Sequence, residues 1–338
     1  MPTVLPIERF LEAGVPVLDV RSPGEFTQGH IPGAVNLPLF SDGERAVVGT
    51  LYKQQGRDAA MLEGLRIVGP KLATLVEQAR SIAPGGKVAV HCWRGGERSA
   101  SVAWLLEKAG YVNVATLAHG YKAFRHHVLA SIGQPWNLQV LGGFTGTGKT
   151  RLLQQLRQQG AQVLDLEALA RHRGSAFGGI GQPAQPSTEQ FENLIWAGLR
   201  HMNLGRPVWV EDESQLVGHA KIPDAFFLQM RNAPLTFVDL PLTERARNLV
   251  EDYGFLPKEE LAAAVLRIQK RLGPQWTKAA LEALDNDNLG KVAEITLAYY
   301  DKTYRRGLAH RPPEGIRRIP ATNLSVADLA QHILEDDQ

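Results

Sequence analysis

Cysteine is almost absent from this chain, in which a single thiol, Cys92, stands among 338 residues. One cysteine excludes an intramolecular disulfide. Apolar runs are short, and none approaches the roughly 20 residues that a membrane-spanning helix needs. The first residues, MPTVLPIERFLEAG, lack the basic start, long apolar core and small-residue cleavage site of a signal peptide. We therefore expect a cytoplasmic protein with no membrane partner.

Net charge is also low, at +2, and the apolar share of 44% and charged share of 21% are ordinary for a soluble globular protein. The chain is too long for one typical hydrophobic core, which indicates two domains. Composition alone favours no particular function, so the functional prediction depends on motifs.

Short apolar runs alternate with helical patterns along most of the chain, which predicts α/β architecture with mostly parallel sheets. The expected strands are VPVLDV (15–20), GAVNLP (33–38), KVAVHC (87–92) and VNVATL (112–117), then LQVLGG (138–143), AQVLDL (161–166), RPVWVED (206–212) and LTFVDL (235–240). From about residue 259 the pattern is helical, with long segments over 261–272 and 289–308. We predict one domain over 1–130, a linker over the turn-forming stretch 131–137, and a second domain over 138–338 with a basic helical C-terminal region.

The stretch HCWRGGERSA (91–100) places the lone cysteine between an expected strand and an expected helix. A thiol acts as a nucleophile only as the thiolate, and three features of this stretch favour that form. The helix beginning near residues 97–99 directs free N–H groups at Cys92, Arg94 and Arg98 supply positive charge, and two glycines let the backbone curl around an anion. Such a loop would stabilise a thiolate, a persulfide or a bound oxyanion. The alternative is a buried cysteine that acts as a small hydrophobic residue.

The spacing Cys-x5-Arg resembles two families, the cysteine-dependent phosphatases and the rhodanese-type sulfurtransferases. The stretch LDVRSPGEFTQGHIPGAVNLP (18–38) resembles the N-terminal rhodanese signature, in which Asp19, Arg21, Glu25, Gly29, His30, Ile31, Gly33 and Ala34 are in place. The resemblance implies a rhodanese-like domain, a catalytic loop with Cys92, Arg94 and Arg98, and a framing role for Asp19, Arg21, Glu25 and His30. The loop is one residue longer than in many rhodaneses, a length shared with phosphatases of the same fold.

The stretch GFTGTGKT (143–150) follows one expected strand, precedes a helical pattern and fits the phosphate-loop motif. Its backbone N–H groups would surround a β-phosphate, Lys149 would neutralise it, and Thr150 is a candidate Mg²⁺ ligand. The candidate phosphate-binding residues are Gly143, Thr145, Gly146, Gly148, Lys149 and Thr150. The strand end VWVEDES (208–214) has the form of a Walker B segment. Its acids Glu211, Asp212 and Glu213 are candidate partners of a metal or a water, or else solvated acids at a strand end.

Positive charge is concentrated in two stretches, 262–278 and 302–318. Such stretches are typical of a surface that binds a polyanion or, equally, of a helix surface that is simply exposed to water. The candidate RNA-binding residues are Arg267, Lys270, Arg271, Arg305, Arg306, Arg317 and Arg318. Aromatic residues nearby, Trp276, Tyr299, Tyr300 and Tyr304, are candidate base-stacking groups or core residues. The glycine- and proline-rich stretch 172–187 predicts a mobile loop near a site.

A rhodanese-like domain followed by a P-loop domain resembles the tRNA 2-selenouridine synthases, and the likeness includes residues 44–60, 163–179, 210–214 and 251–254. It implies replacement of sulfur by selenium in wobble 2-thiouridine of tRNA, with selenophosphate as donor, through geranylation of the sulfur by geranyl diphosphate. A selenophosphate-supplying enzyme is then an expected partner. Cys92 would carry selenium or help to expel geranylthiol, and the P-loop would bind the diphosphate, with a nucleotide as an open alternative. A nucleotide-dependent kinase joined to a sulfurtransferase, and a rhodanese-fold phosphatase, are the competing interpretations.

Overall fold

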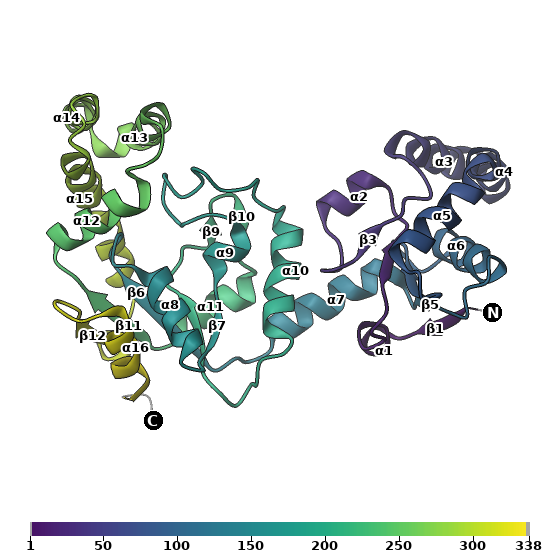
Figure 1. Ribbon diagram of the computed structural model, residues 1–338, viewed down its shortest axis with the longest axis horizontal. Helices are drawn as coiled ribbons and strands as arrows, with labels where there is room; N and C mark the ends of the chain where they lie inside the picture. Colours follow the sequence, from purple (N-terminus) through teal and green to yellow (C-terminus); the bar gives the residue numbers. More distant parts are fainter. Residues whose placement is uncertain (1, 336–338) are drawn as a thin grey trace. The chain divides into compact units, whose positions relative to one another are not determined.

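A computed structural model of the chain describes residues 2–335 (Figure 1). Residues 1 and 336–338, the outer ends of the two predicted domains, lie outside the described residues. The chain divides into two compact units. The N-terminal unit comprises Met1–Ser131 with Glu192–Trp196, and the C-terminal unit comprises Ile132–Phe191 with Ala197–Gln338.

The N-terminal unit contains a five-stranded, all-parallel sheet in the order β1-β5-β4-β2-β3. Its strands are β1 (Thr3–Leu5), β2 (Val17–Asp19), β3 (Val35–Asn36), β4 (Lys87–His91) and β5 (Asn113–Leu117). The four strands expected from the apolar runs are all confirmed. The sequence pattern does not predict strand β1, because it has only three residues and two of them are exposed.

Helices connect the strands of this sheet, and the best-defined start is that of α3, where Ser41 and Glu44 form a capping box. The helices are α1 (Ile7–Leu11), α2 (Pro23–Gln28), α3 (Asp42–Gln55), α4 (Arg57–Val68), η1 (Gly69–Lys71), α5 (Leu72–Ile82), α6 (Glu97–Lys108) and α7 (Gly120–Gly133). Helices α3 and α4 pack against each other and are joined at Gly56, which has a positive φ of 90°. Helix α7 runs to Gly133, so the predicted linker 131–137 begins as helix. The helix ends before Pro135, because the residue that precedes a proline disfavours helical geometry.

The C-terminal unit has a second five-stranded parallel sheet, in the order β12-β11-β6-β8-β7. Its strands are β6 (Leu138–Gly143), β7 (Gln162–Leu164), β8 (Val208–Glu211), β11 (Leu235–Asp239) and β12 (Ile316–Pro320), and a separate antiparallel pair is formed by β9 (Leu216–Val217) and β10 (Ala220–Lys221). The central strand β6 lies between β8 and β11. The loop that follows β6 is therefore flanked by the ends of both neighbours.

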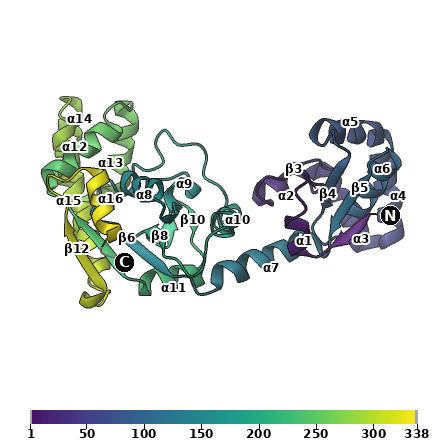
Figure 2. The ribbon, with the colours of Figure 1, turned by 60° about the horizontal axis from the view of Figure 1, so that its bottom comes forward.

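Helices of the C-terminal unit surround this sheet and form a cluster of their own. They are α8 (Lys149–Gln158), α9 (Leu166–Ala170), α10 (Thr188–Leu199), α11 (Asp224–Asn232), α12 (Leu242–Tyr253), α13 (Lys258–Leu272), α14 (Pro274–Asp285), α15 (Leu289–Leu308), η2 (Pro313–Gly315) and α16 (Val326–Glu335). Figures 1 and 2 both show α12 to α15 gathered together, and α15 packs against α12 and α14. The middle of α10 belongs to the N-terminal unit.

The prediction that the C-terminal region is helical is wrong at β12, which adds an edge strand to the sheet beside β11. Arginines 317 and 318 hide its alternation, and Ile319 is its only buried residue. The neighbouring strand supplies the backbone partners that this short segment could not specify by itself. Within residues 2–335, no helix is both long enough and apolar enough to cross a membrane.

Candidate functional site

The cysteine loop, residues 92–98, leaves the C-terminal end of β4, the strand that lies between β5 and β2. Helix α6 begins at Glu97, so its first free N–H groups border the loop. In open parallel sheets, ligands bind beyond the carboxyl ends of the strands. The expected strand, loop and helix around Cys92 are therefore all present.

Close backbone contact fixes the shape of this loop. Gly95 has a φ of 64°, and a Cβ atom there would lie 2.6 Å from the Leu117 carbonyl oxygen. Gly120, the first residue of α7, is equally confined, because its Cβ would lie 2.3 Å from the Cys92 carbonyl oxygen. The Tyr121 N–H donates to that carbonyl over 2.8 Å. Two chain segments thus meet at a distance that only glycine permits.

The Cys92 side chain is 3% exposed and lies under the first turn of α6. Its Sγ is 3.2 Å from Ser99 Oγ and 3.9 Å from the Gly96 carbonyl oxygen. The Ser99 hydroxyl is itself 3.1 Å from that carbonyl. The thiol therefore has polar partners within the loop, while it also packs in the apolar core of the N-terminal unit.

The two candidate arginines of the loop differ in their surroundings. Arg98 donates to Glu25 of α2 over 2.8 Å, and the side chain of Arg94 is exposed. Burial of Glu25 opposes its charge, but the hydrogen bond and the charge of Arg98 outweigh this effect and lower the pKa of Glu25. Arg98 is thus held in place, whereas Arg94 lies at the rim.

A buried ion pair supports the loop from the neighbouring strand β2. Arg21, 1% exposed, donates to both carboxylate oxygens of Asp19 and to the Gly29 carbonyl oxygen. Its guanidinium lies 3.7 Å from the centre of the Tyr121 ring, in the same helix start that contacts the loop. Next to Asp19, burial lowers the pKa of His91 to about 4 although the carboxylate opposes the shift. These contacts agree with a framing role for Asp19, Arg21 and Glu25.

A pocket of about 690 Å³ opens at the cysteine loop. Its walls include Cys92 and Arg98 on one side and residues of α3 and α4, such as Val48 and Met61, on the other. Most of helix α3 and the first turn of α4 fall within residues 44–60, and the motifs predicted no site there. Several apolar side chains of these helices are exposed in the structure, among them Tyr52 at 60%. Exposed apolar groups of this kind are typical of a binding surface.

The phosphate loop, residues 143–150, has the same relation to its own sheet. It leaves the end of β6, and α8 begins at Lys149. The Lys149 Nζ donates to the Gly143 carbonyl oxygen over 2.9 Å, so the ammonium lies over the loop. Gly146 and Gly148 have φ values of 84° and 77°, which give the loop its curvature.

Helices α12 and α15 hold the phosphate loop from outside. Arg245 pairs through two hydrogen bonds with the buried Asp301 and also donates to the Thr145 carbonyl oxygen. The Asn248 side chain donates to the Gly146 carbonyl oxygen over 2.8 Å. A Cβ at Gly146 would lie 2.7 Å from the Arg245 carbonyl oxygen. The sequence motifs do not indicate these supporting residues, because they come from helices that lie 100 residues or more away in the sequence.

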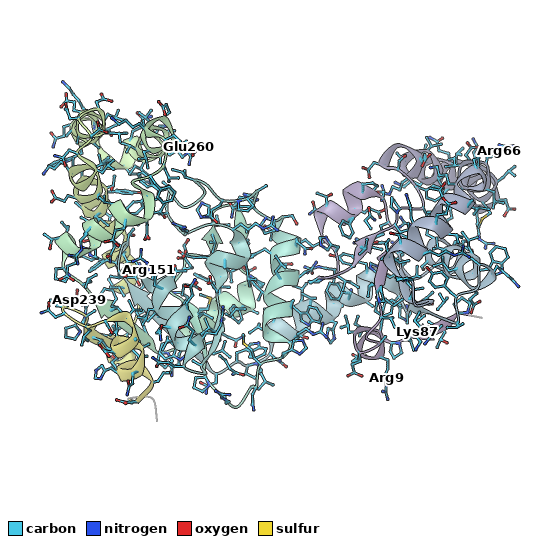
Figure 3. The ribbon with its side chains drawn as sticks, viewed as in Figure 1. Arg9, Arg66, Lys87, Arg151, Asp239 and Glu260 are labelled. Atoms are coloured by element: carbon cyan, nitrogen blue, oxygen red, sulfur yellow. The ribbon has the colours of Figure 1, made fainter. Side chains whose placement is uncertain are left out.

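Ion pairs tie α8 to α12 as well. Arg151, labelled in Figure 3, lies 2.5 Å from an oxygen of Asp252 and 3.6 Å from one of Glu251. Both acids are in the last turn of α12 and belong to the stretch 251–254. Because all three side chains are a third or more exposed, these pairs orient the helices more than they stabilise them.

Four acidic side chains, Asp165, Glu167, Glu211 and Glu213, lie near one another at the ends of β7 and β8, and Glu167 contacts the phosphate loop. The Thr150 hydroxyl donates to Glu167 over 3.0 Å. Burial and then the charges of Asp165 and Glu167 raise the pKa of Glu211 well above its usual value. Burial and Glu167 do the same to the pKa of Glu213, against the opposing charge of Lys149. The motifs did not identify Asp165 and Glu167, although Asp165 lies near the end of the expected strand 161–166 and Glu167 directly follows it.

Asp212 has a different place from its two neighbours, because it lies among basic side chains. It forms ion pairs with Arg231 and Arg311 and accepts from the Tyr304 hydroxyl over 2.5 Å. Successive side chains of a strand end point to opposite sides, which separates Asp212 from Glu211 and Glu213. Tyr304 also accepts from the Gly143 N–H, so it supports the phosphate loop and is not a free stacking group.

The remaining basic candidates are mostly on the surface. Arg267, Lys270, Arg271, Arg305, Arg306 and Arg318 are exposed, and Arg317 is half-buried. Arg317 donates to Thr236, and Arg318 lies 4.8 Å from the centre of the Phe237 ring. Trp276 is 50% exposed, whereas Tyr300 accepts from the Ala176 N–H. The surface therefore presents cationic groups on α13 and α15, and the two β12 arginines have structural contacts too.

Comparison with known proteins adds to this geometry. Residues 136–319 match the family described as tRNA 2-selenouridine synthase AAA domain, and residues 7–127 match the rhodanese-like domain. These matches confirm the expected fold class, a rhodanese-like domain followed by a P-loop-type domain.

Relatives with the name tRNA 2-selenouridine synthase resemble the chain over much of its length. That of Nitrosomonas europaea is 44% identical over 71% of this chain, and that of Bdellovibrio bacteriovorus is 42% identical over 73%. The matched regions span 64% and 66% of those two relatives. The protein of Chromohalobacter salexigens is 36% identical over 94% of each chain.

Proposed function

The chain belongs to the tRNA 2-selenouridine synthase family, and from this premise we propose that it converts 2-thiouridine to 2-selenouridine at the wobble position of tRNA. The selenium donor is selenophosphate, and the sulfur is first alkylated by geranyl diphosphate. The observation that carries this proposal is the presence of two anion-binding loops, one with a thiol and one with a lysine, each at the centre of its own parallel sheet.

The phosphate loop binds the diphosphate of the alkyl donor. In the transfer, the thiouridine sulfur attacks the first carbon of the geranyl group, the carbon–oxygen bond breaks, and diphosphate departs with the bonding electrons. The base loses its N3 proton to solvent, which leaves a neutral S-geranyl base. Lys149 and the N–H groups at the start of α8 stabilise the charge that develops on the departing diphosphate.

The residues beside Thr150 fit a Mg²⁺ ion. A hydroxyl and carboxylates are the hard oxygen ligands that this ion prefers, and Glu167 lies close enough to Glu213 that its charge adds to burial in raising the pKa of Glu213. No group of three or more His, Cys, Asp or Glu residues within 2–335 could hold a metal alone, so diphosphate oxygens would complete the set. Thr150, Glu167 and Glu213 would hold the ion, which neutralises diphosphate charge when bound.

The cysteine loop handles the second half of the reaction. Alkylation makes the sulfur a thiolate leaving group. The selenium of selenophosphate attacks C2 of the base, and geranylthiolate departs with the carbon–sulfur electrons and takes a proton from solvent. Water then cleaves the selenium–phosphorus bond and releases phosphate. Cys92 is placed at a pocket where it carries selenium or helps to expel the thiol, and Arg98, Arg94 and the start of α6 stabilise anions there. The cations on α13 and α15 bind tRNA phosphates.

Nucleoside analysis by mass spectrometry tests this proposal directly. Thiouridine-containing tRNA is incubated with the protein, geranyl diphosphate and selenophosphate, and each reagent is omitted in turn. We expect 2-selenouridine only in the complete mixture, and S-geranyl-2-thiouridine when selenophosphate is omitted. ATP consumption with unchanged tRNA nucleosides would contradict the proposal and favour the kinase alternative.

A further inference from the structure

An apolar pocket in the C-terminal unit shares a wall with the phosphate loop. Thr145, in the middle of that loop, lines the pocket, and Leu249, Val250, Leu289 and Val292 of α12 and α15 form its sides. Phe177 and Tyr253 also line it, and Phe177 belongs to the glycine-rich stretch 172–187. A molecule with its phosphates on the loop would therefore extend its other end directly into an apolar space.

The polar atoms of this pocket are already engaged. The Thr296 hydroxyl donates to the carbonyl oxygens of Val292 and Ala293 in its own helix. The Tyr300 hydroxyl accepts from the Ala176 N–H, and the Ser175 hydroxyl accepts from the Phe177 N–H. No Asp, Glu, Lys, Arg, Asn or Gln lines this pocket in the described part of the chain. A nucleoside needs hydrogen-bond partners for its base and ribose, and these walls offer few.

We propose that this pocket binds the hydrocarbon chain of an allylic diphosphate whose phosphates lie on the phosphate loop. The proposal rests on the proposed function and assigns the tail end of its alkyl donor to residues of α12, α15 and the stretch 172–187. Burying a chain of methyl and methylene groups against leucine and valine side chains is favourable in proportion to the apolar area removed from water.

The pocket is small in this structure. Its free space is about 50 Å³, which is a narrow slot. The wall that can yield is the stretch 172–187, which contains four glycines and carries Phe177. A longer chain would enter by displacing Phe177, while the helical walls and Thr145 stay in place.

Binding measurements on the full-length protein separate tail from phosphates. Affinities are measured by calorimetry for inorganic diphosphate, dimethylallyl diphosphate, geranyl diphosphate and ATP. We expect geranyl diphosphate to bind about tenfold or more tightly than inorganic diphosphate, with dimethylallyl diphosphate between them. Leu249→Asn should weaken geranyl diphosphate about tenfold and change inorganic diphosphate less than twofold. The same substitution at the exposed Leu228 of α11, Leu228→Asn, is the matched control and should change neither.

The outcomes separate this proposal from the proposed function. Equal affinity for inorganic and geranyl diphosphate, with both lost in Lys149→Ala, would leave the phosphate site standing and overturn the tail pocket. Diphosphate binding that Lys149→Ala does not change would overturn both. ATP binding tighter than that of geranyl diphosphate, and weakened by Leu249→Asn, would assign the pocket to a nucleoside and overturn the proposal. If Leu249→Asn lowers the melting temperature by more than a few degrees, the variant is not used. The affinities of the unmodified protein for inorganic, dimethylallyl and geranyl diphosphate then test the tail pocket.

Discussion

The cysteine loop and the phosphate loop are built alike and charged differently. Each leaves the central strand of a five-stranded parallel sheet, contains at least one glycine with positive φ, and leads into a helix. The cysteine loop carries the two arginines Arg94 and Arg98 and one acid, the exposed Glu97. The phosphate loop is contacted by charges of both signs, because Lys149 and Arg245 donate to its backbone carbonyls and Glu167 accepts from Thr150.

This difference shows what the backbone and the side chains each contribute. Backbone N–H groups at a helix start make both loops receptive to anions, whatever their sequence. The side chains then decide which chemistry follows. A thiol beside arginines is suited to a nucleophile or chalcogen carrier, whereas a lysine opposite carboxyl groups is suited to a phosphate ligand with a divalent cation.

The largest expected effect is loss of selenium transfer when the thiol is removed. Cys92→Ala should abolish 2-selenouridine formation and leave geranylation largely working, so that S-geranyl-2-thiouridine accumulates. Nucleoside analysis of treated tRNA measures both products. Ser81→Ala, at an exposed position of α5, serves as control and should change neither. Wild-type levels of 2-selenouridine in Cys92→Ala would refute the role of this loop.

The converse substitution acts on the other loop. Lys149→Ala should lower geranylation by roughly tenfold to a thousandfold, because the variant cannot donate a charge-assisted hydrogen bond to the leaving group. Initial rates of S-geranyl-2-thiouridine formation measure the effect. Lys87→Ala, at the exposed start of β4 and labelled in Figure 3, is the control. Normal geranylation by Lys149→Ala would show that the phosphate loop binds another ligand. It would contradict the assignment of alkylation to this loop and of selenium transfer to the cysteine loop.

Backbone confinement can be tested with two glycines of the N-terminal unit that have similar φ values. Gly95→Ala should destabilise this unit by about 3 kcal/mol or more, because a Cβ would clash with backbone atoms as well as adopt a positive φ. At Gly86, with a φ of 67°, the nearest atoms would be 3.9 Å away, so Gly86→Ala should cost only about 1 kcal/mol. Denaturant unfolding followed by fluorescence compares them. Equal destabilisation by the two substitutions would show that the close approach at Gly95 is unimportant.

Acid should act on the N-terminal unit through His91. Burial holds the pKa of this imidazole at about 4 in the folded chain, below its ordinary value of 6.5. The unfolded state therefore binds more protons between pH 6.5 and 4, and the stability that His91 contributes is lost as pH falls through that window, by at most about 3 kcal/mol. His91→Phe should flatten the dependence of unfolding free energy on pH in this range. His126→Phe, at an exposed position of α7, should not. An unchanged slope in His91→Phe would assign the acid sensitivity to other groups.

The smallest effect is expected from the basic surface. Reversing Arg305, Arg306, Arg317 and Arg318 to glutamate should weaken tRNA binding several-fold and lower its salt dependence by about one unit of slope for each phosphate that the variant no longer binds. Reversing only the exposed pair Arg305 and Arg306 separates RNA binding from the structural contacts of β12. Arg9→Glu and Arg66→Glu, both labelled in Figure 3, are controls on the N-terminal unit. Unchanged tRNA affinity at two salt concentrations would show that these arginines are solvent-exposed side chains that do not bind RNA.

Local patterns predicted most elements and both loops. The eight expected strands all form, and α15 has the bounds of the segment predicted over 289–308, because burial on a sheet or helix face leaves a periodic apolar pattern. Strands β1 and β12 escaped prediction, since each is short, largely exposed, and defined by its pairing with a neighbour. Asp212 was grouped with Glu211 and Glu213 by adjacency alone, and the strand geometry separates it from them.

The amino-acid sequence by itself determined the fold class and the two loops, because a strand, a glycine-rich turn and a helix start are all local in the chain. The tertiary structure alone decided what surrounds each loop. Arg245 and Tyr304 hold the phosphate loop, Glu25 holds Arg98, and the pockets beside Cys92 and Thr145 are lined by helices distant in sequence. Contacts of this kind depend on which helices cover a sheet edge, and no periodicity within one segment records that choice.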